Sequence, residues 1–430
     1  MKVVKSGDLS AFGGLNFVFE SLNNLGINRI VDKNLPTLKC NSKYSWTDVF
    51  YSFMSIYFCG GDCIEDLNIN LRHHLHNNPM FKLPSPDTVL RRLSSLAVPT
   101  RKCFTQRGSV EHEYCTNDTA MDVNLRILKK MGVFKSSELT LDYDNTIIFS
   151  EKKDCKMTYK RDYGYQPGVC TVNEEHILYV ENRNGNSDAK SFQVQSLERI
   201  FNALDARGIK KVKHFRADAA SYQYEIIKLL ARKTDFFYVG CRNSYVEKYF
   251  TRIDKWSKTS DAFGELEVGS IMINPFSKNA TKDGETPASY RLLVKRRKLK
   301  SGQMNIITQD AYEYRAVLSN NFEMEDLELA AFYAKRGNME KQFDILKNDF
   351  GWQKMPFSNL NENLVFLYFS AICRNLYHHI ICSFSKTVKY LKPEYRIKKF
   401  IFRFIILPSK WIIQGRQYKL RIYSNKDCFT

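Results

Sequence analysis

Residues 139–149, "LTLDYDNTIIF", decide the fold, because here the spacing of apolar residues changes from a helical period to the alternation of a strand. Two acidic residues of this stretch, Asp142 and Asp144, stand two positions apart and project from the same face of the expected strand. Acidic residues are uncommon inside strands, and two on one face repel each other unless a positive group lies between them. The stretch therefore predicts a first strand with one chemically unusual face.

The segments that follow predict an α/β layer. Residues 169–183, "VCTVNEEHILYVENR", are expected to form two strands joined by a tight polar turn. Helical spacing and strand-like runs then alternate: a helix at 190–208, a strand at 211–218, a helix at 221–233 and a strand at 235–242. The resulting order, β-β-β-α-β-α-β, indicates a mixed central sheet.

The region before this layer, residues 1–115, is predicted to be helical because its apolar residues recur at helical spacing. Residues 84–96, "PSPDTVLRRLSSL", predict a short basic helix with Ser85 as its cap and a proline at its first position. Arg91 and Arg92 fall on its exposed side and are candidate DNA-binding residues. The alternative is an ordinary surface helix, which has the same pattern.

The region after the layer begins with residues 243–320, which are predicted to be a β-rich insertion. An apolar helix at 361–384 follows, and an arginine and two histidines within it argue against a membrane span. Residues 385–430 form a basic C-terminal segment with strand-like patches at 400–407 and 418–423. We therefore expect that the protein does not contact a membrane.

The charge of the chain predicts a polyanionic partner. There are 65 Lys and Arg against 46 Asp and Glu, a formal net charge of +19, and basic residues cluster in 289–300 and 392–421. Such a balance favours nucleic acid, although a basic protein that is simply soluble is the alternative. Eleven scattered cysteines without a CxxC pair, and an N-terminus without an apolar leader, indicate reduced thiols and a cytoplasmic setting.

Four polar residues share one stripe of the helix predicted at 333–347, "YAKRGNMEKQFDILK". Tyr333, Arg336, Glu340 and Lys347 fall within an arc of about 60°, the kind of stripe that an amphipathic helix usually turns to its core. A solvated face with charge pairs three and four residues apart is the alternative.

Three carboxylates are candidates for metal chemistry. Asp218 closes the strand at 211–218, where open α/β sheets place functional groups, although it could equally cap the next helix. A helix across the sheet can bring Glu340 to Asp218 and to the acidic pair of the first strand. Converging carboxylates in a basic protein suit two Mg²⁺ ions, for which Mn²⁺ can substitute. Such ions activate a water or a 3′-hydroxyl and stabilise the leaving oxygen of a phosphodiester.

The gaps in Tyr333-x2-Arg336-x3-Glu340-x6-Lys347 resemble the YREK signature of DDE transposases from bacterial insertion sequences. "LDYDNT" and "RADAASY" resemble the motifs of the first and second catalytic Asp of that family. "YKRDYGYQP", "NRNGNSDA" and N-terminal stretches resemble the thirteen-eighty group of insertion sequences. The resemblance covers most of the chain, although two alanines replace the usual Ser-Gly after Asp218.

This resemblance implies an RNase H-like catalytic core at 137–242 and 321–384, interrupted by the insertion at 243–320. A helical DNA-binding region at 1–115 precedes it, and the basic segment at 385–430 follows. Some relatives hold a flipped base on a Trp of the insertion, which makes Trp256 a candidate for stacking. A packed core Trp is the alternative.

The resemblance also implies the roles of single residues. Asp144 carries the first catalytic carboxylate, since the family motif runs Asp-x-Thr, and Asp142 is an alternative ligand or a supporting group. Asp218 and Glu340 complete the metal site. By the same resemblance, contacts to DNA phosphate near the cut are expected from Tyr333, Arg336 and Lys347.

The expected function is that of a transposase in the bacterial cytosol. It would bind the terminal inverted repeats of its own element as a homodimer in the synaptic complex, cut the DNA there and join the ends to target DNA. Two alternatives remain: a metal-dependent DNA nuclease without strand transfer, and a non-catalytic DNA-binding regulator derived from a transposase.

Overall fold

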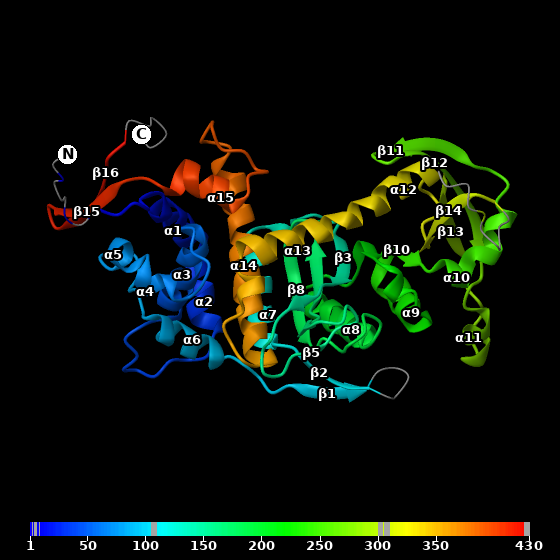
Figure 1. Ribbon diagram of the computed structural model, residues 1–430, viewed down its shortest axis with the longest axis horizontal. Coiled ribbons are helices and arrows are strands. Elements are labelled where there is room, and N and C mark those ends of the chain that lie inside the picture. The colour runs from blue at the N-terminus through cyan, green and yellow to red at the C-terminus, as the bar shows by residue number, and fades with distance from the viewer. Residues whose placement is uncertain are drawn as a thin grey trace.

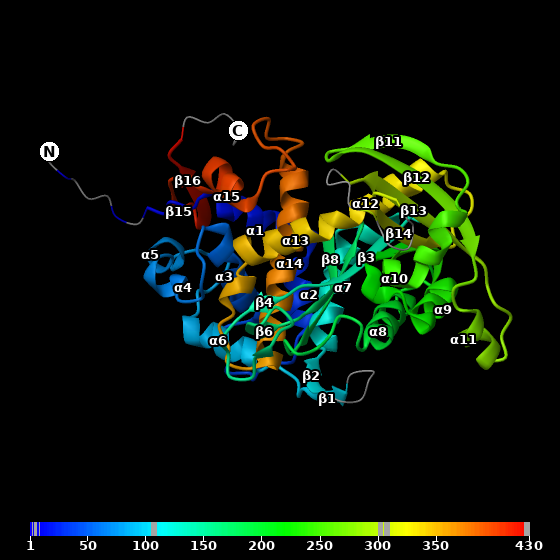
Figure 2. The same cartoon turned by 45° about the vertical axis from the view of Figure 1, so that its right-hand side comes forward.

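One large sheet crosses the middle of the molecule in this computed structural model (Figure 1). The described residues are 9–104, 110–299 and 310–424, together with 1, 3, 7 and 304. The first helices lie at one end of the molecule and the later strands of the sheet at the other, while yellow and orange helices lie between them (Figures 1 and 2). The chain is therefore a mixed α/β protein with a large central sheet.

The centre of the sheet has the predicted order of elements. Its members are β3 Thr140–Asn145, β7 Gly168–Val172, β8 His176–Arg183, α8 Gln193–Asp205, β9 Val212–Ala217, α9 Tyr224–Lys233 and β10 Thr234–Cys241. β3 pairs antiparallel with β7 and β7 with β8, whereas β3 pairs parallel with β9 and β9 with β10. The β-β-β-α-β-α-β order is confirmed.

The predicted insertion is β-rich, and its strands extend the same sheet. They are β11 Ser257–Asp261, β12 Gly264–Ile273, β13 Tyr290–Lys298 and β14 Tyr312–Ser319, with the short helices α10 Asn243–Val246 and α11 Ser277–Lys282. β14 pairs antiparallel with β10, so the sheet continues without a break from the centre. The basic cluster at 289–300 lies on β13, except Lys300, which is outside the described residues.

The N-terminal region is helical up to about residue 96. It contains α1 Gly14–Leu25, α2 Ile27–Asn34, α3 Trp46–Phe58, α4 Asp66–Ile69, α5 Arg72–Leu75 and α6 Pro86–Ser94. α6 begins as predicted, because the Ser85 side chain accepts a hydrogen bond from Thr88 N and Pro86 takes the first position. The prediction of helix up to 115 is wrong, since β1 Arg101–Phe104 and β2 Glu111–Cys115 form a hairpin before α7 Asp118–Lys130. β2 pairs with β8, and such a distant partner is not visible in local spacing.

The full sheet runs in the order β1-β2-β8-β7-β3-β9-β10-β14-β13-β12-β11 within the described residues. A separate three-stranded sheet, β4 Ile148–Phe149, β5 Lys156–Met157 and β6 Tyr163–Tyr165, lies between β3 and β7 in the chain. The stretch 139–149 is therefore two strands and not one.

Two helices and a turn replace the single helix predicted around 333–347. They are α12 Asp326–Ala334, the 3₁₀ turn η4 Lys335–Gly337 and α13 Asn338–Asp349. The Phe332 carbonyl accepts a hydrogen bond from Arg216 Nη1, and Gly337 has low helix propensity. Both features favour a break in the helix at this point.

The C-terminal part begins with the buried helix α14 Leu360–Phe384, as predicted, and no helix among the described residues is long and apolar enough to cross a membrane. The prediction of a strand at 400–407 is wrong. The residues form α15 Ile397–Phe400 and the π-helical turn η6 Ile401–Ile405, in which Phe400 and Phe404 stack four residues apart. The hairpin β15 Ser409–Gln414 and β16 Gln417–Ile422 then follows, so the strand at 418–423 is confirmed.

The two faces of the sheet bury different cores. Tyr143 of β3 packs into the core that contains α8 and α9, whereas Val180 of β8 packs into the core that contains α14 and the N-terminal helices. Because strand side chains alternate, Asp142 and Asp144 lie on the face opposite Tyr143. This is the face that α12 and α13 approach.

Candidate active site at the ends of β3 and β9

Two of the predicted acidic residues are neighbours at the carboxyl ends of β3 and β9. The parallel register pairs Tyr143 with Ala217, so the next residues along the two strands are Asp144 and Asp218. Burial, and after it the charge of Asp218, raises the pKa of Asp144 from 3.8 to about 6. The two carboxylates therefore interact directly and need a positive partner.

Arg336 supplies a positive charge to this acidic pair. Its Nη1 donates to Asp144 Oδ2 at 2.8 Å, and both side chains are less than one-fifth exposed. Burial works against the charged form of Arg336, but Tyr333, Asp144 and Asp218 together raise its pKa above the usual value. η4 thus brings Arg336 directly over the end of β3.

Asp218 also has a local role. Its Oδ1 accepts a hydrogen bond from Ala220 N at 3.0 Å and so caps the short 3₁₀ turn η2 Ala219–Ser221. The alternative role as the cap of α9 is wrong, because α9 begins later, at Tyr224. The capping bond fixes the orientation of the carboxylate beside Asp144.

Asp142 is bound in a different way from Asp144. Arg216 on β9 donates from Nε to Asp142 Oδ1 and from Nη2 to Oδ2, both at 2.7 Å, and both side chains are buried. Arg216 also donates to Glu174 at 2.9 Å, and Glu174 accepts from Asn338 at 2.6 Å. This cluster connects β3 and β9 to the start of α13.

Sequence reasoning missed Arg216 and Glu174. An arginine in the apolar strand "VKHFRA" was the available signal, because a buried arginine needs an acidic partner. Although burial opposes its charge, the contacts with Asp142 and Glu174 raise the pKa of Arg216. Glu174 has a φ of 66°, in the left-handed region that non-glycine residues rarely adopt, and no pattern in the sequence indicated it.

Glu340 and Lys347 line one cavity with Asp144. The cavity has a volume of about 590 Å³ and its wall also includes Asn145, Thr146, Ile147, Ile148, Phe149, Tyr159, Lys160, Gln166, Phe343 and Gln353. Lys347 Nζ donates to Thr146 Oγ1 at 2.7 Å and to the Ile147 carbonyl at 2.8 Å. Burial, and after it the charge of Lys160, lowers the pKa of Lys347.

Tyr333 lies beside the same strand ends. Its hydroxyl donates to the Ala217 carbonyl at 3.1 Å, directly before Asp218. A Cβ atom on Gly240 of β10 would lie 2.7 Å from this hydroxyl, so glycine lets the Tyr333 side chain pack close to the backbone of β10. All four residues of the predicted stripe therefore face the ends of β3 and β9 or the cavity beside them, although the helix is broken between them.

The donor set suits a hard divalent cation in chemical type. Asp144 and Asp218 offer adjacent carboxylates whose repulsion a cation would relieve, and Glu340 lies on the cavity wall with Asp144. Among the described residues, however, no three His, Cys, Asp or Glu side chains are grouped closely enough to hold a metal ion. Arg336 supplies the positive charge beside Asp144 in this arrangement.

The other candidate DNA-binding residues lie apart from this site. Arg91 on α6 is exposed, whereas Arg92 is half-buried, stacks over Trp46 and donates to Ser42 at 3.2 Å. Trp256 is half-buried, and the guanidinium of Arg296 lies 3.9 Å from the centre of its ring. One face of the indole is thus covered by a cation.

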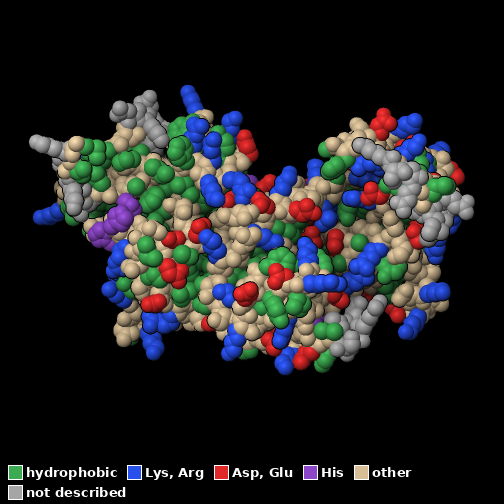
Figure 3. All heavy atoms as spheres, in the orientation of Figure 1, with side chains coloured by type: hydrophobic (Ala, Val, Ile, Leu, Met, Phe, Trp, Pro, Cys, Tyr) green, Lys and Arg blue, Asp and Glu red, His purple; other side chains and the backbone are tan. Residues whose placement is uncertain are grey.

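Seen in the orientation of Figure 1, the surface above α13 is hollowed, with Lys and Arg side chains along its rim (Figure 3).

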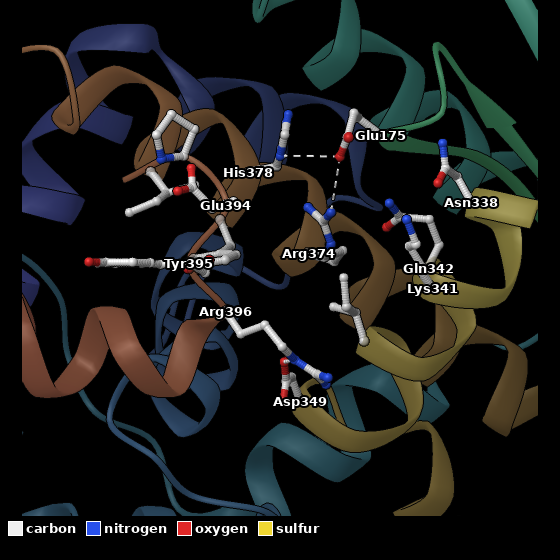
Figure 4. Close-up of a pocket in the computed structure, with 14 residues that line it drawn as sticks. Glu175, Asn338, Lys341, Gln342, Asp349, Arg374, His378, Glu394, Tyr395 and Arg396 are labelled. Carbon is white, nitrogen blue, oxygen red and sulfur yellow. Dashed lines mark hydrogen bonds and ion pairs between the residues drawn. The ribbon is translucent and has the colours of Figure 1, made fainter. Parts of the chain in front are cut away.

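A second cavity, of about 400 Å³, lies on the side of α13 that carries Asn338, Lys341 and Gln342 (Figure 4). Arg374 of α14 points into it and is 3.6 Å from Glu175, as is His378. Burial, and after it the charge of Arg374, lowers the pKa of His378 to about 4. Glu174, which accepts a hydrogen bond from Asn338, and Glu175, which lies beside Arg374, therefore connect the β7–β8 turn to α13 and α14.

Comparisons with known proteins give one family. A family model described as "Transposase DDE domain group 1" matches residues 3–426. Among solved structures, the cryo-EM structure of a piggyBac transposase synaptic complex with hairpin DNA matches 91% of this chain and 79% of its own, at 11% identity and a TM-score of 0.44. A search of curated proteins gave no significant match.

Proposed function

The chain belongs to the family of DDE transposases of domain group 1, and from this premise we propose that it binds the terminal inverted repeats of a mobile element, cleaves the DNA there and transfers the strand to target DNA. The neighbouring carboxylates of Asp144 and Asp218, with Glu340 on the wall of the same cavity, are the observation that carries the proposal. Assignment to the YREK group rests on the spacing of Tyr333, Arg336, Glu340 and Lys347.

We further propose that the strand order β8-β7-β3-β9-β10 is an RNase H-like core at 137–242 and 321–384. It would be interrupted by the insertion at 243–320 and flanked by DNA-binding regions at 1–115 and 385–430, of which 2, 4–6, 8, 105–109 and 425–430 lie outside the described residues. The net charge of +19 supports phosphate contacts in these flanking regions, where Arg91 is exposed.

Asp144, Asp218 and Glu340 are the proposed ligands of two Mg²⁺ or Mn²⁺ ions. When bound, such ions would activate the attacking hydroxyl and stabilise the leaving oxygen of the phosphodiester. Asp142 is proposed as a positioning residue, because Arg216 engages both of its carboxylate oxygens. Arg336 would turn from Asp144 to the DNA phosphate, and Lys347 would hold a phosphate in the cavity.

The test is cleavage of a labelled duplex that carries the end of the element, with Mg²⁺ or with EDTA. Glu340→Ala should abolish nicking at the repeat boundary while DNA binding persists, and Glu328→Ala, an exposed acid of α12, should cleave like the wild type. Binding without cleavage by the wild type, even with Mn²⁺ and paired ends, would favour the non-catalytic regulator.

Joining of pre-cut ends to a target plasmid separates transposition from simple nuclease action, because both reactions use the same carboxylates. Joined products are expected, in a complex that contains two protomers and two DNA ends. A wild-type protein that cleaves but never joins would instead be a metal-dependent nuclease.

A further inference from the structure

The cavity beside Asp144 is also lined by exposed aromatic residues that take no part in the proposed chemistry of the carboxylates. Phe149, Tyr159 and Lys160 line it together with Glu340 and Lys347 of α13. Phe149 is 48% exposed and Tyr159 is 74% exposed. Large aromatic side chains this exposed, on the wall of a polar cavity, indicate a surface for a flat apolar ligand.

The turn that carries Tyr159 and Lys160 is held by backbone hydrogen bonds and close packing. Thr158 N donates to the Asp162 carbonyl at 2.8 Å, and Arg161 N donates to the Thr158 carbonyl at 2.9 Å. Thr158 is buried, and the backbone at Gly185 packs so closely that a Cβ there would lie 2.3 Å from the Lys156 carbonyl. The backbone that carries Tyr159 is therefore held in place before any ligand arrives, which lowers the entropy lost on binding.

The cavity wall carries two acids, Asp144 and Glu340, as well as two lysines, and the lysines together with the exposed rings fit an anion that has aromatic faces. Lys160 and Lys347 both reach the cavity, and the oxygen atoms that Lys347 contacts are uncharged. Nucleotides have both properties, since every base offers a ring face and every linkage a phosphate. Bases inside a duplex are stacked on each other and hide those faces, so the fitting ligand is an unpaired nucleotide.

Trp256 is a poorer platform than Tyr159. Arg296 covers one face of its ring, and the backbone at Gly269 packs so close to the indole that a Cβ there would lie 3.2 Å from it. We propose that Phe149, Tyr159 and Lys160 form a binding site for unpaired nucleotides of the DNA strand next to the scissile phosphate. This proposal rests on the proposed function in one respect, because it assumes that the scissile phosphate enters the same cavity.

The test is binding of a single-stranded oligonucleotide that contains the fluorescent base 2-aminopurine, and of a duplex of the same sequence, to the full-length protein. Wild type and Tyr159→Phe should quench the fluorescence on binding the single strand. Tyr159→Ala should lose the quenching and bind the single strand roughly 5- to 150-fold more weakly, the effect of one lost base–aromatic stack, with duplex binding little changed. Tyr163→Ala is the matched control, because Tyr163 is 48% exposed on the same small sheet but does not line the cavity.

Equal quenching and affinity in Tyr159→Ala and wild type would overturn the site, as would an equal loss in Tyr163→Ala. A wild-type protein that does not bind the single strand would also overturn it. The proposed transposition is tested separately from the nucleotide site. Quenching that depends on Tyr159, without any metal-dependent cleavage, would support the nucleotide site and contradict the proposed transposition. Metal-dependent cleavage by a protein whose Tyr159→Ala variant binds the single strand like the wild type would support the reaction and overturn the nucleotide site.

Discussion

Arg336 Nη1 lies 2.8 Å from Asp144 Oδ2 and occupies one side of a carboxylate that is also a proposed metal ligand. A guanidinium and a divalent cation repel each other, so they should compete for Asp144. We expect Arg336→Gln to bind Mn²⁺ roughly tenfold more tightly than wild type in the absence of DNA, the effect of one lost charge-assisted hydrogen bond. Calorimetric titration of Mn²⁺ into both proteins measures the difference.

The same variant should cleave DNA more slowly, because it lacks the proposed phosphate contact of Arg336. Arg336→Lys keeps the charge but not the planar fork, so it should bind Mn²⁺ like the wild type and still cleave poorly. Identical Mn²⁺ affinity in Arg336→Gln and wild type would show that Arg336 and the metal ion do not compete for Asp144.

The same substitution should change stability by different amounts at the two acids of β3. Asp142→Asn breaks the buried pair with Arg216 and is expected to lower the free energy of unfolding by about 3–5 kcal/mol. Burial raises the pKa of both acids, so the loss in Asp142→Asn comes from the buried Arg216, which loses its two hydrogen bonds to this residue. Asp144→Asn leaves Arg336 beside Asp218 and Tyr333, so stability at neutral pH should be unchanged or higher. Urea unfolding followed by circular dichroism measures both values.

A cycle with Arg216→Met isolates the pair that involves Asp142. The double variant should be more stable than Asp142→Asn alone, because it leaves no buried guanidinium without its partner. If Asp142→Asn proved neutral and Asp144→Asn strongly destabilising, the supporting and ligand roles of these two residues would have to be exchanged.

Local patterns predicted the centre of the sheet, because the alternation in β3, β7, β8, β9 and β10 is set by burial along each strand. β1 and β2 escaped prediction, since their pairing with β8 is not encoded nearby. Arg216 belonged to a predicted strand, but nothing in the sequence showed that its partner is Asp142 and not Asp144. That choice depends on the register of β3 against β9, which pairs Asp142 with Arg216. The register is a property of the assembled sheet.

The pKa of Asp144 predicts a specific dependence of stability on pH. The folded protein holds this proton up to about pH 6, whereas the unfolded chain releases it near 3.8. Between these values the folded state binds more protons, so the contribution of Asp144 to the free energy of unfolding falls as pH rises and is constant above about 6. The total change is up to roughly 3 kcal/mol.

The difference in unfolding free energy between wild type and Asp144→Asn isolates this contribution, because every other titrating group is common to both proteins. Asp144→Asn should gain relative stability as the pH rises from about 4 to about 6, and no more above that. Urea titrations without metal at several pH values test it. A difference that does not vary with pH would show that Asp144 titrates normally.

Lys347 should contribute one phosphate contact to DNA binding. Among the described residues its ammonium group donates to the uncharged oxygens of Thr146 and Ile147. Burial and Lys160 lower its pKa more than Asp344 raises it, so an anion in the cavity would stabilise its charged form. Removal of one such contact reduces the slope of log affinity against log salt by about 0.9 for duplex DNA. We expect this reduction in Lys347→Gln, measured by fluorescence anisotropy over a range of salt concentrations. Lys341→Gln, whose side chain lines the other cavity beside α13, should keep the wild-type slope. Equal slopes in all three proteins, together with a loss of stability in Lys347→Gln, would instead mean that Lys347 only fastens the end of β3 to α13.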